Sequence, residues 1–168
     1  MRNLVLLFAA LLVAGCGEKS AIEKALEEAV ELNSLQERND LYYQVNKSEP
    51  YSGWVKVLYD LGQARRLFQV KDGKPDGPYT LWHENGRKQT EGIFKDGEPD
   101  GLYTGWFFNG QKKEEATFKD GEVDGPYMKW HDNGQKMAEG TYKDGESVSG
   151  KYWNSKGEEV ENLLESQK

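Results

Sequence analysis

A 24-residue repeat constrains the fold of this 168-residue chain more than any other feature. The segment GPYTLWHENG at 77–86 recurs as GLYTGWFFNG at 101–110 and as GPYMKWHDNG at 125–134. A degenerate copy at 53–62 precedes these three, and a truncated copy at 150–157 follows them. Self-similarity at a fixed period predicts a repeat architecture in which each unit packs against its neighbours.

The turn residues of each repeat predict β-hairpins. Asn-Gly and Asp-Gly, which favour type I′ turns, separate runs rich in Tyr, Trp, Phe and Thr. We expect two antiparallel strands per unit, joined by Asn-Gly, with longer turns such as 96–101, DGEPDG, between units. With a leading strand at Leu41–Val45, the chain is predicted to be mainly β. Its expected fold is a single-layer, twisted antiparallel meander of about nine or ten strands.

Charge and composition exclude several protein classes. The net charge of −7 argues against a nucleic-acid partner, because binding to phosphate needs a basic surface. The repeat region 41–157 has 17 basic and 18 acidic residues, a net charge of −1, which disfavours a polybasic lipid-binding patch. Aromatic residues make up 12% of the chain, more than a disordered sequence carries.

The N-terminus has the pattern of an export signal. Arg2 precedes the uninterrupted apolar run Leu4–Ala14, and small residues lead to Cys16, the single cysteine of the chain. The stretch Val13–Cys16 resembles the lipobox of bacterial lipoproteins. That resemblance implies a signal peptide at 1–15, removal of the signal, and acylation of Cys16 with palmitate-type chains. The mature protein would then be anchored to a membrane of the bacterial cell envelope, namely the outer membrane, facing the periplasm, in a diderm host.

Helices are predicted at both ends of the mature chain. Ser20 and Glu23 fit a capping box, and an apolar face recurs at Ile22, Ala25, Leu26, Ala29, Leu32 and Leu35. We expect an acidic amphipathic helix of about four turns within the anchor segment 16–40. Docking of this helix on the sheet, a coiled coil and a partner groove all remain open. A short helix is expected in 158–168, where Val160, Leu163 and Leu164 are apolar.

The repeat pattern resembles a known family. The sequence G-x-Y-x-x-W-x-x-N-G, followed by K-D-G-x-x-D-G, is similar to the variant MORN repeat over residues 41–157. The chain looks most like bacterial lipoproteins described as antitoxins of toxin–antitoxin systems. The resemblance implies a twisted β-meander that serves as an interaction surface.

Candidate catalytic and metal-binding groups are explained by structural roles. His83 and His131 share a column with Tyr59 and Phe107, so this position is predicted to need a flat ring. The loops 96–101 and 120–125 imitate half of a calcium loop, but the acidic residue required at the twelfth position is absent. Charged columns are expected to form ladders on a solvated face; they are Lys88, Lys112 and Lys136 with Glu91, Glu115 and Glu139. No enzymatic activity, metal or cofactor is predicted.

Two aromatic columns are the candidate partner-binding residues. They are Tyr79, Tyr103 and Tyr127, and Trp82, Trp106 and Trp130. Because the two columns are three residues apart, they are expected on opposite faces of the sheet. We expect the Tyr column to pack, whereas the sequence leaves open whether the Trp column is exposed.

Three functional hypotheses follow from these features. The first is a lipid-anchored, non-enzymatic module whose repeat sheet binds a protein partner, such as a toxin that it neutralises. The second is a carbohydrate-binding module, because rows of Trp and Tyr stack on the sugar rings of a glycan such as the cell wall. The third is a structural envelope lipoprotein without a specific ligand.

Overall fold

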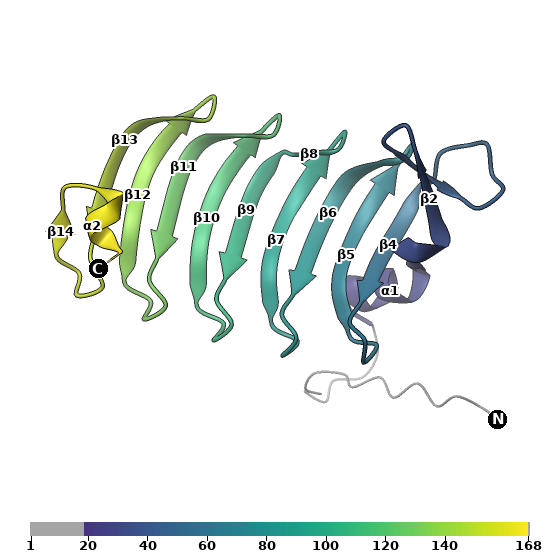
Figure 1. The fold of residues 1–168 in the computed structure, drawn as a ribbon, viewed down its shortest axis with the longest axis horizontal. Coiled ribbons are helices and arrows are strands. Elements are labelled where there is room, and N and C mark those ends of the chain that lie inside the picture. The colour runs from purple at the N-terminus through teal and green to yellow at the C-terminus, as the bar shows by residue number, and fades with distance from the viewer. Residues whose placement is uncertain (1–18, 168) are drawn as a thin grey trace.

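The fold was obtained as a computed structural model that describes residues 19–167. The predicted signal peptide and the predicted acylation site Cys16 therefore lie outside the described residues. The described part is one large sheet of consecutive hairpins, with a small second sheet near its N-terminal end and a short helix near each end (Figure 1). The helices are α1 (Ala21–Glu28) and α2 (Leu163–Ser166), with a 3-10 turn at Leu32–Ser34.

Nine long strands form the body of the sheet. They are β4 (Gly53–Leu58), β5 (Ala64–Lys71), β6 (Lys74–Trp82), β7 (Lys88–Lys95), β9 (Gly101–Trp106), β10 (Lys112–Lys119), β11 (Glu122–Trp130), β12 (Lys136–Lys143) and β13 (Glu146–Trp153). Each pairs antiparallel with the next strand in the sequence, which confirms the predicted meander. The short strands β1 (Val30–Glu31), β8 (Glu98–Pro99) and β14 (Glu159–Val160) complete a 12-stranded sheet.

The hairpin turns at the two ends of the strands differ from one another. Asp72 and Gly73, with φ of 49° and 85°, have the two left-handed residues of the predicted type I′ turn. At Asn85-Gly86 only Gly86 has a positive φ, and the His83 carbonyl accepts from the Gly86 N–H at 2.9 Å. The Asn-Gly prediction was therefore wrong in type: these are turns closed by a left-handed glycine, with an additional bond from the His83 N–H to the Arg87 carbonyl.

The expected longer turns between units are absent from the described chain. Asp-Gly pairs such as Asp120-Gly121 already reverse the chain, and the next residues, Glu122–Trp130, form one continuous strand. Within that strand the second Asp-Gly pair causes a register shift, and Gly125 has a φ of 124°. A bulge, which needs a glycine with positive φ, thus takes the place of the predicted loop.

The predicted four-turn helix was too long. The capping box of Ser20 and Glu23 is present, but the helix ends at Glu28 because Ala29 adopts an extended conformation. Val30 then pairs in parallel with Val55, so that β1 covers the middle of the outer edge of β4. The following residues form β2 (Leu35–Arg38), which pairs with β3 (Leu41–Gln44) in a separate two-stranded sheet. The predicted leading strand at Leu41–Val45 thus exists, but it does not belong to the main sheet.

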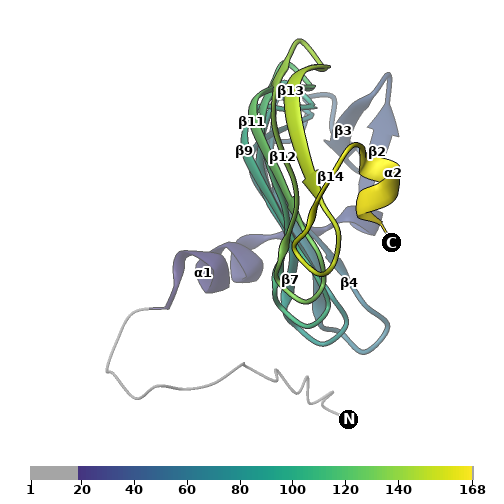
Figure 2. The same cartoon turned by 90° about the vertical axis from the view of Figure 1, so that its left-hand side faces the viewer.

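The N-terminal segment passes around the first edge of the sheet. α1 lies on one face of the main sheet, whereas the β2–β3 hairpin and α2 lie on the opposite face (Figure 2). Ala25 of α1 and Ala29, directly after the helix, pack against Leu67, and the docked helix that the sequence left open is the observed arrangement. On the other face, Val55, Phe68 and Val70 form a second buried cluster, against which Leu32 and Leu35 pack. The core is therefore concentrated at the N-terminal end of the array.

Candidate functional site

The two predicted aromatic columns lie on opposite faces of the sheet, as expected. Tyr79 pairs with Gly92 and packs against the Phe68 cluster, under the β2–β3 hairpin. Trp82 packs against the Leu67 cluster, under α1. We call the first surface the tyrosine face, defined by Tyr79, Tyr103 and Tyr127, and the second the tryptophan face, defined by Trp82, Trp106, Trp130 and Trp153.

On the tyrosine face the rings pack against one another. The ring pairs Tyr79–Phe94, Tyr103–Phe118 and Tyr127–Tyr142 have centroid distances of 5.2, 5.6 and 5.4 Å. Burial raises the pKa of the Tyr127 phenol to about 12, and the nearby Glu114 carboxylate acts in the same direction. Burial also raises the pKa of Tyr103, whose hydroxyl donates to Glu114 Oε1 at 3.4 Å. These tyrosines are half-buried packing residues that extend the core along the array.

On the tryptophan face, Trp106, Trp130 and Trp153 each lie beneath a lysine of the preceding repeat unit. Lys88, Lys112 and Lys136 place their Nζ atoms 5.9, 5.3 and 5.4 Å from the ring centroids of Trp106, Trp130 and Trp153. The same ammonium groups contact carboxylates three residues later: Lys88 bonds Glu91 at 2.7 Å, Lys112 bonds Glu115 at 2.6 Å, and Lys136 bonds Glu139. The predicted charge ladder is therefore present, and its cations also cover the indoles.

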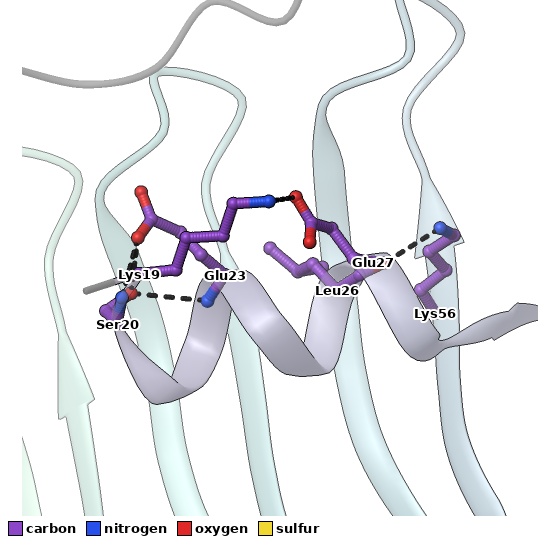
Figure 3. Close-up of polar contacts among 6 residues, drawn as sticks. All are labelled: Lys19, Ser20, Glu23, Leu26, Glu27 and Lys56. Carbon is purple, nitrogen blue, oxygen red and sulfur yellow. Dashed lines mark hydrogen bonds and ion pairs between the residues drawn. The ribbon is translucent and has the colours of Figure 1, made fainter. Parts of the chain in front are cut away.

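α1 covers only the first part of the tryptophan face. Its partly buried side chains Ile22 and Leu26 contact the cluster that contains Trp54 and Trp82. The capping box fixes its start, and Lys56 Nζ donates to the Leu26 carbonyl at 2.9 Å near its end (Figure 3). Of the three candidate tryptophans, Trp82 thus packs against a helix of its own chain. Within residues 19–167, the clusters that contact α1 do not include Trp106 or Trp130.

Two exposed apolar residues on the tryptophan face were not singled out from the sequence. Ile93 is 51% exposed and Leu102 is 56% exposed, on the neighbouring strands β7 and β9. Pro78, which pairs with Ile93, is also exposed. The sequence contains enough information to place them on this face. Ile93 and Leu102 are each next to a packed ring, Phe94 and Tyr103, and neighbouring residues of a strand point to opposite faces.

The Asn-Gly turns form a hydrogen-bonded ladder between units. Asn85, Asn109 and Asn133 donate from Nδ2 to the carbonyls of Phe108, Asp132 and Ser155, each at 2.9 Å. Their Oδ1 atoms accept from backbone N–H groups two residues later in the same turn. Each asparagine therefore closes its own turn and binds the next one, a role that turn propensity alone does not predict.

The histidine column does more than supply a flat ring, so the sequence interpretation was incomplete. His83 Nε2 lies 3.1 Å from the Trp106 carbonyl, and His131 Nε2 lies 3.0 Å from the Trp153 carbonyl. At the equivalent position of the first unit, Tyr59 Oη donates to the Trp82 carbonyl at 2.7 Å. The column thus connects units through a polar atom of the aromatic side chain, and Phe107 is the member without such an atom.

Replacing Phe107 with histidine is expected to stabilise the protein. The new Nε2 would donate to the Trp130 carbonyl, as His83 does one unit earlier, with a gain of about 1 kcal/mol in the free energy of unfolding. Urea denaturation measures the free energy of unfolding of Phe107→His, which is expected to rise, and of the reverse change His131→Phe, which is expected to fall. Equal stability of the wild type and the two variants would show that the ring alone matters.

In the acidic loops, aspartate carboxylates accept hydrogen bonds from backbone N–H groups. Asp76 Oδ2 accepts from the Asp96 N–H at 3.3 Å, and Asp100 Oδ2 accepts from the Asp120 N–H at 3.5 Å. The Lys143 ammonium beside Asp124 lowers the pKa of that carboxyl group. Across residues 19–167, no group of three or more His, Cys, Asp or Glu side chains is placed to hold a metal ion. Turn chemistry therefore accounts for these aspartates.

Within the part of the chain that the structure describes, no helix has the length and apolar character needed to span a bilayer. No curated protein matches the chain in a sequence comparison. The protein-family model for the MORN repeat variant matches residues 99–120 and 123–144. These segments cover most of β8–β10 and of β11–β12. The chain therefore carries MORN-variant repeats, a type of repeat used for binding or interaction.

Proposed function

We propose that this protein is a non-enzymatic, lipid-anchored component of the bacterial envelope that captures a protein partner on the uncovered part of its tryptophan face. The single observation that carries the proposal is the exposure of Ile93 and Leu102, on the neighbouring strands β7 and β9 of the face that also carries the half-buried Trp106, outside the cluster that α1 covers. Adjacent exposed apolar side chains on an otherwise charged face are typical of a protein-interaction site.

The lysines favour a protein partner over a glycan. A sugar ring stacks on the flat face of an indole, and on this surface Lys112 and Lys136 lie over the rings of Trp130 and Trp153. A partner protein needs no such free ring, because it gains from the apolar side chains and from the alternating Lys and Glu groups around them. The face carries both signs of charge, which supports specific pairing with a complementary protein surface.

The anchor and the antitoxin-like role are part of the same proposal. Acylation of Cys16 would place the tether five residues before α1 begins at Ala21. The sheet would then be held close to the membrane, where it would meet a partner that acts at the envelope. A toxin bound and neutralised there is the partner that the family resemblance favours.

The test is crosslinking in cells that express the tagged, full-length chain, followed by quantitative mass spectrometry. The double variant Ile93→Glu/Leu102→Glu is expected to reduce the yield of the principal crosslinked protein about tenfold or more, because charge would be buried in the contact. Both side chains are exposed, so the fold should be retained. Leu61→Glu is the matched control, since Leu61 is 91% exposed in a turn.

Undiminished crosslinking of the same protein to the double variant would refute the assignment of this face. The membrane fraction of the same cells tests the anchor. The wild type is expected there, and a Cys16→Ser variant is expected in the soluble fraction.

A further inference from the structure

The last long strand of the sheet has an open outer edge. β13 pairs with β12 along its length, but β14 covers only Tyr152 and Trp153 on the other side. Residues 146–151 have no partner on that side among residues 19–167, and all six are exposed. The first edge is also covered only in part, because β1 pairs with Val55 and Lys56 of the six-residue β4.

The direction of the free backbone groups follows from the β13–β14 pairing. The Asn154 N–H donates to the Glu158 carbonyl at 2.9 Å, toward the β14 side. Residues two apart in a strand present their N–H and C=O groups to the same side, so Tyr152 and Gly150 also face outward. Gly150 lies beyond the last pair of β14, so its N–H and carbonyl point toward solvent. The N–H and C=O groups of Lys151, one residue further along the strand, point the other way, toward β12.

A small hollow opens beside this edge on the tyrosine face. Gly140 and Gly150 are opposite each other in the register, and the Tyr152 hydroxyl lies 3.1 Å from the place where a Cβ atom of Gly150 would be, so the Tyr152 side chain forms one wall of the space beside them. The hollow has a volume of about 60 Å³, and its walls include Tyr127, Tyr142 and Leu163. A water molecule takes up about 30 Å³ in the liquid, so the space suits one small side chain.

We propose that the open edge of β13 binds an extended segment of a partner protein, about six residues long. The segment adds as an antiparallel strand in line with β14, exchanges hydrogen bonds with Gly150, and places one small apolar side chain in the hollow. Backbone pairing provides affinity in such strand addition, and a side-chain pocket provides selectivity. This site is separate from the tryptophan face and does not depend on the function proposed above.

A second copy of the chain fits this edge poorly. Its own β14 occupies the same side of its β13 at Tyr152 and Trp153. In an antiparallel pairing of two β13 strands, the β14 strands approach the ends of the free stretch and shorten it further. A flexible terminus or loop of another protein carries no such obstruction, so an extended segment is the occupant that the edge accommodates.

The test begins with a phage-displayed library of random octapeptides, selected on the folded protein. We expect enrichment of peptides with a shared small apolar position. A synthetic copy of the enriched peptide is then titrated into ¹⁵N-labelled protein. At saturation the Gly150 amide should exchange with solvent about tenfold more slowly, while the Lys151 amide, already paired with β12, should change little.

Two variants test the geometry independently of the fold. Gly150→Pro removes the outward N–H at an edge position and is expected to abolish peptide binding. Leu163→Glu places charge in the wall of the hollow and should weaken binding about tenfold through loss of the apolar side-chain contact. Leu163 is 41% exposed, so this variant remains informative when the proline variant fails to fold.

The tryptophan-face variant Ile93→Glu/Leu102→Glu should bind the peptide normally, which separates this site from the proposed function. Failure to enrich any peptide, or binding that leaves Gly150 exchange unchanged, overturns the proposal.

Discussion

Gly140→Ala is expected to destabilise the protein by about 2–3 kcal/mol, whereas Gly92→Ala, at the same position two repeats earlier, should have little effect. A Cβ atom on Gly140 would lie 2.4 Å from the Ser149 carbonyl oxygen and 3.3 Å from the Gly150 Cα. Both are backbone atoms of β13, so the clash is relieved only by moving that strand. A Cβ atom on Gly92 meets its nearest atom, Cδ2 of Tyr103, at an ordinary 3.6 Å.

Urea denaturation of both variants measures the difference in the free energy of unfolding. Neither glycine has a positive φ, so backbone strain contributes to neither value. Similar stabilities of the two variants would contradict the close approach of β12 and β13. The comparison also bears on the hollow beside β13, because the same pair of glycines forms its floor.

Phe68→Ala is expected to cost about 3–5 kcal/mol, the usual range for a large-to-small change in a core. Phe68 is 4% exposed and packs with Val55 and Val70. Its ring centroid lies 6.3 Å from that of Tyr42 and 6.4 Å from that of Tyr79. The side chain therefore joins the β2–β3 hairpin to the main sheet, and its loss leaves a cavity between them.

The damage should be local, because units of a repeat array contact only their neighbours. In hydrogen exchange, amides of β3–β5 are expected to lose protection before those of β10–β12. Phe108→Ala is the control, since Phe108 is 60% exposed in a turn and should cost less than about 1 kcal/mol. Uniform loss of protection along the sheet would show that the array unfolds as one unit.

The repeat body was predictable from sequence because its signals are local. Each strand is bounded by turn residues a few positions away, so the period of 24 residues fixes the hairpins and places the Tyr and Trp columns on opposite faces. The turn types were harder to predict from the sequence. Asn85 has the residue type of a type I′ turn, but its side chain is used to bind the following turn, and the backbone adopts the conformation that permits this.

The N-terminal segment was mispredicted because its structure is determined by distant contacts. Leu32 and Leu35 continue the helical period of Ile22 and Ala25, yet they pack on the other face of the sheet. Pairing of Val30 with Val55 covers part of the first edge, and this gain exceeds the helix propensity of a few residues. The exposure of Ile93 and Leu102 was also not foreseen, because it depends on where α1 ends over the sheet.

The bonds between successive turns give the array a direction. Along one margin, side chains of an earlier turn donate to carbonyls of a later one, as Asn85 does to Phe108. Along the other margin the polarity is reversed, since the Gly97 N–H donates back to the Pro75 carbonyl. Toward each neighbour, a unit therefore presents a donor at one margin and an acceptor at the other. The donor is an asparagine side chain toward the following unit and a backbone N–H toward the preceding unit. The two ends of such an array are chemically different, and one kind of cap does not serve both.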